Sequence, residues 1–235
     1  MTLTNFPNGI KIGDDVNLQE DSALFVDVTA TNIVASEVVA ESIEVDDVTL
    51  TDTVWDDLRV PVLSTKLGGS KDPDFAKMFD DGNSSQGVFS YLFSATIEEE
   101  LYFMVQLPHG WKYESSLHPH VHWIPTANGS EGQKVSWGLE YVVGAIDSVF
   151  GNTTIVYGDT SHSDSETLVA DKHYLTELPA ISMLGVDSVS AMLLCRVFRD
   201  ATGVGGTDDY ANDVALVEID FHYESDRIGS NNEYS

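Results

Sequence analysis

The chain has 235 residues and a formal net charge of -28, from 39 acidic and 11 basic side chains. This negative charge repels nucleic-acid backbones and anionic membrane surfaces, so we expect the protein to bind neither. A single cysteine excludes an intrachain disulfide. Cys195 lies in an apolar run, which predicts a buried and unreactive thiol.

The first segment, residues 1–15, is rich in turn-forming residues and has no regular hydrophobic period. We expect it to be an extended arm that docks on a partner, because a free terminus of this composition would not be ordered by itself. The candidate partner-binding residues of this arm are Leu3, Phe6, Pro7, Ile10 and Ile12.

Residues 16–53 contain an apolar repeat with a period of five, which fits neither an α-helix nor an uninterrupted strand. Short extended rungs with a bend after each would explain the period. One such rung cannot cover its own backbone, so we expect three chains to wind together as a homotrimer. The alternative is one irregular strand pair on the main domain. The predicted trimerisation residues are Val28, Ile33, Val38, Ile43 and Val48.

From residue 54 to residue 235 the chain alternates strand-like segments with Asn, Gly, Asp and Pro clusters. This pattern predicts an all-β fold, an antiparallel β-sandwich or jelly roll, preceded by the β-repeat stalk and the arm. A single helical turn is expected at 74–79. The predicted strands are 87–94, 101–107, 118–124, 135–143, 153–157, 188–198 and 214–224.

Three histidines alternate along one predicted strand, at His118, His120 and His122. Alternate residues of a strand point to the same side, so three imidazoles would share one face. Such an array could bind Zn, Fe or Ni. A structural or hydrogen-bonding role is the favoured interpretation, because no cysteine or acidic ligand lies nearby in the sequence.

A second polar series, Glu218, Asp220, His222 and Glu224, alternates with apolar residues. Its functional interpretation is a carboxylate and histidine pair for acid–base catalysis. The favoured interpretation is the polar face of a half-exposed strand. No nucleophile elbow, phosphate-binding loop or zinc-protease motif accompanies it. We therefore expect a protein that is not an enzyme and uses no cofactor.

Arginines are rare in this acidic chain, so Arg196 and Arg199 are expected to pair with carboxylates. The following segment, 200–210, could hold Ca²⁺ but lacks the EF-hand spacing, and a flexible surface loop is the better interpretation. Trp123 and Trp137 are expected in the core. If the domain binds glycans instead, Trp123 or Tyr210 would be the aromatic platform.

Several motifs resemble known phage proteins. Residues 4–9, TNFPNG, resemble the N-terminal peptide of phage head fibre and capsid decoration proteins. The main domain resembles proteins encoded in the virion regions of tailed phages. The residues that carry this second resemblance are 54–61, 106–109, 118–123, 219–224 and 228–230.

The resemblance implies an arm that binds the capsid shell, a trimeric stalk and an outward β-sandwich. The expected function is a capsid decoration, cement or head fibre homotrimer, attached to the major capsid protein on the virion exterior and made in the host cytoplasm. The alternative is a tail fibre or spike whose sandwich binds a host glycan. A third class, a metal-dependent hydrolase, would use the three alternating histidines.

Overall fold

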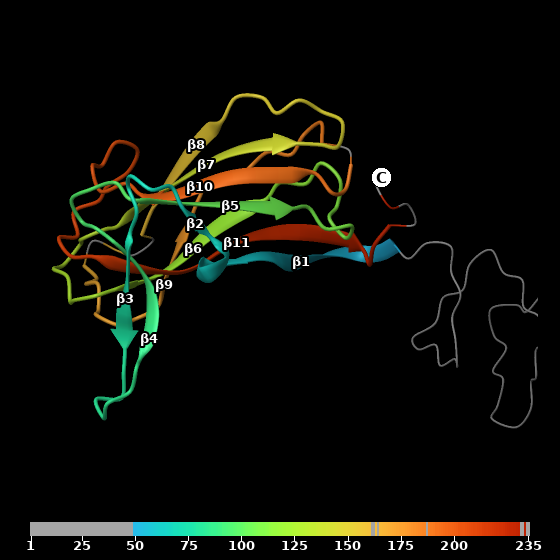
Figure 1. Cartoon of the computed structure of the whole chain (residues 1–235). Helices are drawn as coiled ribbons and strands as arrows, with labels where there is room; N and C mark the ends of the chain where they lie inside the picture. Colours follow the sequence, from blue (N-terminus) through green and yellow to red (C-terminus); the bar gives the residue numbers. More distant parts are fainter. Residues whose placement is uncertain (1–48, 161–162, 164, 187, 231–232, 234–235) are drawn as a thin grey trace, which may run out of the picture. The chain divides into compact units, whose positions relative to one another are not determined.

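In the computed structural model, residues 49–160, 163, 165–186, 188–230 and 233 are described. The predicted arm residues Leu3, Phe6, Pro7, Ile10 and Ile12 and the five predicted trimerisation residues between 28 and 48 lie outside this part of the chain. The described residues form two antiparallel β-sheets (Figure 1). The single helical element of these residues is a short 3₁₀ turn, η1 (Val62–Ser64).

The first sheet, here the β11 sheet, is six-stranded, with the order β3-β4-β11-β6-β9 and β1 on the same edge of β11 as β4. The second, the β10 sheet, has the order β2-β5-β10-β7-β8. The β11 sheet contains β1 (Thr49–Pro61), β3 (Asp74–Phe79), β4 (Val88–Phe93), β6 (His118–Pro125), β9 (Tyr174–Glu177) and β11 (Val214–Arg227). The β10 sheet contains β2 (Lys66–Leu67), β5 (Glu100–Gln106), β7 (Ser136–Gly144), β8 (Thr154–Asp159) and β10 (Met192–Arg199).

Eight of these strands are nested like a long hairpin folded over itself. β7 pairs with β8, β6 with β9, β5 with β10, and β4 with β11, all antiparallel. Successive nested pairs fall alternately in the two sheets, from the innermost pair, β7 and β8 in the β10 sheet, to the outermost pair, β4 and β11 in the β11 sheet. This is the connectivity of a jelly roll, so the predicted all-β, antiparallel sandwich is confirmed.

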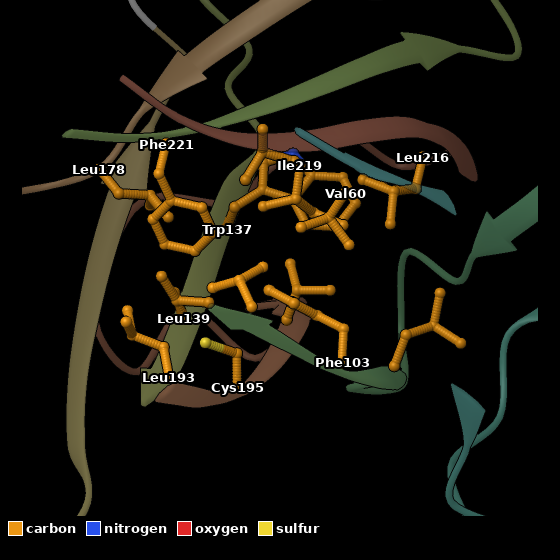
Figure 2. Close-up of a cluster of buried hydrophobic side chains, with 14 of the residues drawn as sticks. Val60, Phe103, Trp137, Leu139, Leu178, Leu193, Cys195, Leu216, Ile219 and Phe221 are labelled. Atoms are coloured by element: carbon orange, nitrogen blue, oxygen red, sulfur yellow. The ribbon is translucent and has the colours of Figure 1, made fainter. Parts of the chain in front are cut away.

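The core lies between the two sheets, where alternate residues of each strand point inward. Figure 2 shows Phe221 and Ile219 of β11 facing Leu139, Leu193 and Cys195 of the β10 sheet. Trp123 and Trp137 are fully buried, as the sequence predicts. Burial raises the pKa of the Cys195 thiol to about 12, consistent with an unreactive cysteine.

The segment Asp74–Phe79 is strand β3, so the predicted helical turn is wrong. Pairing with β4 decides its conformation: the Phe75 ring lies 5.6 Å from that of Phe89 and 5.1 Å from that of Tyr91 across the strands. Gly82 and Gly87 adopt positive φ in the connecting loop, where a side chain would be strained. The strands β1, β2 and β9 were not predicted.

A buried arginine holds the segment between β10 and β11. Arg199 is fully buried and forms a bidentate ion pair with Asp208, at 2.8 and 2.9 Å. It also donates to the carbonyls of Phe93, Tyr210 and Asn212. Pairing of Arg199 with a carboxylate is confirmed.

Arg196, the other arginine predicted to pair with carboxylates, does so on the outer face of the β10 sheet. Arg196 contacts Glu98, Glu100 and Glu140 at 3.2, 2.6 and 2.9 Å.

Asp200, also fully buried, accepts hydrogen bonds from the backbone N–H groups of residues 204–206. The segment 200–210 is therefore tied by its own carboxylates, rather than being the loosely held loop that its composition indicates.

Candidate functional site

The polar residues singled out in the sequence meet on the outer face of the β11 sheet, where β1, β11 and β6 lie side by side. The inward side chains of β11, such as Ile219 and Phe221, are buried in the core, so the residues between them point outward. In the strand register Asp220 lies opposite His120 of β6, and His222 lies opposite His118. The polar face predicted for 218–224 is confirmed.

Four side chains make a compact histidine–carboxylate cluster, which we define as His120, Asp220, His222 and Asp57. His120 Nδ1 lies 3.5 Å from Asp220 Oδ1, and His222 Nε2 lies 3.5 Å from Asp220 Oδ2. Asp57 of β1 approaches from the other side, with its Oδ1 3.1 Å from His222 Nε2. One ligand atom from each of His120, Asp220 and His222 lies within 4.8 Å of the other two.

The cluster is sheltered although it lies on an outer face. The side chains of Asp220 and His120 are 8% and 10% exposed, whereas that of His222 is 39% exposed and opens the cluster to solvent. Among the described residues, neither His120 Nδ1 nor Asp220 Oδ1 has a hydrogen-bond partner. Buried polar atoms without partners are rare in native proteins, and each one calls for an explanation.

A chain of three polar side chains, which we call the relay, lies beside the cluster and runs from Asp220 through His122 to His173. His122 Nε2 is 3.4 Å from Asp220 Oδ2, and His122 Nδ1 is 2.8 Å from His173 Nε2. The Asp220 carboxylate raises the pKa of His122 against the opposing effect of burial. Burial, and then the charge of His122, lower the pKa of His173. The two rings thus share one hydrogen bond, in which the tautomers decide the donor.

Asp220 is an ionised carboxylate at neutral pH. Its partial burial favours the protonated form, but the facing His120 and His122 outweigh that effect and hold the pKa of Asp220 well below its usual range. The cluster thus combines a fixed negative charge with imidazole nitrogens at short range. Such an arrangement can hold a proton or bind a cation.

The three alternating histidines do not act as one set. His118 packs against the ring of Trp55, with centroids 5.2 Å apart, and lies outside the cluster. His122 belongs to the relay, so His120 alone of the three contributes to the cluster. The sequence did not reveal Asp57 or His173, because neither is near the other members along the chain.

The remaining carboxylates of the β11 series have ordinary surface partners. Glu218 forms a bidentate ion pair with Arg59, at 2.7 and 2.8 Å, and Glu224 pairs with Lys112 at 2.5 Å. Neither belongs to the cluster, so the four even positions of β11 do not form a common catalytic group.

In the described part of the chain, no helix has the length and apolar character to cross a membrane.

Comparison with known proteins adds little to this picture. No family model matches the chain, and no curated protein matches it. Among solved structures, the chain is similar to the CBM27-1 module of Caldicellulosiruptor saccharolyticus in complex with mannohexaose. The two are 12% identical over 70% of this chain and 96% of the module, with a TM-score of 0.29.

The chain is also similar to structures of infectious bursal disease virus. The Gx strain structure is 12% identical over 70% of this chain and 43% of that chain, with a TM-score of 0.22. The VP2 subviral particle is 12% identical over 68% and 48%, with a TM-score of 0.20. At such scores these likenesses do not bear on the function of this protein.

Proposed function

We propose that the protein is a structural component of a tailed-phage virion. It acts as a capsid decoration, cement or head fibre protein without enzymatic activity. It forms a homotrimer on the capsid exterior and attaches to the major capsid protein through residues 1–15. The sequence resemblance to virion proteins supports the assignment, and the jelly-roll domain suits a role as a rigid building unit.

The observation that carries the proposal is the apolar β3–β4 hairpin. Only the last three residues of β4 pair with β11, so the rest of the hairpin extends beyond the sheet (Figure 1). Phe75 and Phe89, whose rings stack, are 52 and 45% exposed on one face of the hairpin, and Val88 is 61% exposed on the other face. Clustered apolar side chains on a surface mark a contact with another molecule. A protein built into an assembly needs such a contact, whereas a monomer does not.

The charge of the chain also fits an assembly role. With a net charge of -28, copies of the protein repel one another in solution. Specific contacts, such as an apolar hairpin and an N-terminal arm, must therefore hold them in place. Three arms on one trimer would strengthen a weak individual contact through their high effective concentration.

The test is binding of purified protein to phage capsids that lack it. The full chain should have three times its 25.7 kDa mass in solution, and a variant without residues 1–15 should remain a trimer of its own shorter chain but no longer bind capsids. Capsid occupancy equal to that of the full chain would refute the role of the arm, and a monomeric mass would refute the trimer.

A matched pair of valines tests the hairpin. Val88→Asp places a charge on the exposed hairpin, and Val149→Asp places it at a 95% exposed position in the β7–β8 connection. We expect the first change to weaken trimer or capsid association and the second to leave both unchanged. Equal behaviour of the two variants would contradict the assignment of the hairpin as a contact surface.

A second candidate function, a tail fibre or spike that binds a host glycan, rests on one exposed ring. Trp123 and Tyr210 cannot be sugar platforms, because they are 0 and 1% exposed. Trp55 is 58% exposed on the same sheet face as the cluster, with the edge contact to His118 fixing its ring. Glycan-array binding by the full chain that disappears in Trp55→Ala would favour this function over capsid decoration.

A further inference from the structure

We propose that His120, Asp220 and His222 bind one divalent transition-metal ion, beside the Asp57 carboxylate that contacts His222. The ion would join β6 and β11 across the outer face of the β11 sheet. Two imidazoles and a carboxylate form a donor set that suits Zn²⁺ and related first-row metals.

The distances favour ligands around an ion over hydrogen bonds. A normal N–H···O bond spans about 2.7–3.2 Å, whereas His120 Nδ1 and Asp220 Oδ1 are 3.5 Å apart, as are His222 Nε2 and Asp220 Oδ2. With bonds of about 2.0–2.1 Å, two ligand atoms of a tetrahedral zinc ion lie about 3.3 Å apart. These two separations, each to a different oxygen of Asp220, lie close to that value, and the three ligand atoms lie within 4.8 Å of one another.

Two unpaired atoms identify the place where an ion would bind. His120 Nδ1 and Asp220 Oδ1 face each other at 3.5 Å, are buried, and form no hydrogen bond within the part of the chain that the structure describes. An unpaired donor or acceptor costs about 1–3 kcal/mol when it is buried. A metal ion between the two atoms would satisfy both, whereas no group of the described residues forms a hydrogen bond with either.

The surroundings of the cluster complete the site. Asp220 Oδ2 faces His122, which the relay to His173 holds in place. Such neighbours orient the ligands of a metal site and increase its affinity. The partly exposed His222 leaves a route from solvent for the ion.

The experiment is a titration of Zn²⁺ into chelator-treated, full-length protein by calorimetry, followed by Co²⁺ absorption spectroscopy. We expect about one Zn²⁺ per chain, a Co²⁺ spectrum typical of nitrogen and oxygen ligands, and a rise in Tm on adding Zn²⁺. His120→Gln and Asp220→Asn should weaken binding at least ten-fold, because even the loss of a group that only orients a ligand costs about 10–100-fold.

His118→Gln is the matched control, because His118 lies on the same face of the same strand but outside the cluster. It should bind Zn²⁺ as the unmodified chain does. If His120→Gln fails to fold by circular dichroism, His222→Gln replaces it, since this side chain is more exposed. The proposal is overturned if no Zn²⁺ binds, if the cluster variants bind it unchanged, or if His118→Gln loses binding to the same degree.

Discussion

The Arg199→Met substitution tests how the structure holds the segment between β10 and β11. The guanidinium of Arg199 is fully buried and meets Asp208, whose side chain is 1% exposed. Replacing Arg199 by the apolar Met leaves the Asp208 charge uncompensated and three carbonyl groups without their donor. Breaking a buried pair on one side costs about 3–5 kcal/mol, because the remaining charge stays buried.

This cost has a measurable size. In a domain of this length each kcal/mol lowers Tm by about 2–4 °C, so Arg199→Met should lower it by about 6–20 °C. Urea unfolding followed by tryptophan fluorescence should show a matching loss of unfolding free energy. Trp137 is a suitable reporter, because its ring is 5.1 Å from that of Phe93, whose carbonyl accepts from Arg199.

The control is Arg59→Met. Arg59 also makes a bidentate pair, with Glu218, but its side chain is 66% exposed. Exposed pairs contribute little to stability because water and salt screen them, so this variant should unfold close to the unmodified protein. If both variants lose the same stability, or if Arg199→Met loses less than about 1 kcal/mol, burial does not set the strength of this interaction.

Three further predictions concern single residues. Burial and a hydrogen bond to a β1 carboxylate raise the pKa of Tyr223 to about 12. The Tyr223 hydroxyl therefore contributes to stability below pH 10, and this contribution is lost as the pH rises toward 12. In a plot of the urea midpoint of unfolding against pH, Tyr223→Phe should flatten the alkaline part. Gly158→Ala should lower the free energy of unfolding in urea by about 1–3 kcal/mol, because the new Cβ would lie 2.2 Å from the Glu177 carbonyl oxygen. Gly151→Ala is the control, because its new Cβ would meet no atom. Cys195 should react with a thiol reagent only in denaturant, and rapid reaction of the native protein would contradict its burial.

The period of two in the sequence accounts for most of what was predicted correctly. It located seven strands and placed His118, His120 and His122 on one face, because side chains alternate along any strand. It could not place Asp220 beside His120, since that proximity depends on the register of two strands a hundred residues apart in the chain.

Short elements were harder to predict from local sequence. Asp74–Phe79 carries no clear period, and its strand conformation comes from aromatic contacts with β4. β9 has four residues, too few for a pattern. The binding partners of Arg199 also follow from tertiary structure, although the scarcity of arginine in an acidic chain indicated that it would be paired.

The central position of β11 affects how the domain can be made on the ribosome. β11 is the last strand of the described fold, and β1, β4 and β6 all pair with it. During translation these three strands are synthesised before β11 and cannot pair with it until it is made. This delay favours slow folding and leaves their edges exposed to aggregation. A stop codon placed just before residue 214 would therefore remove the strand that joins the sheet, not merely shorten one of its edges.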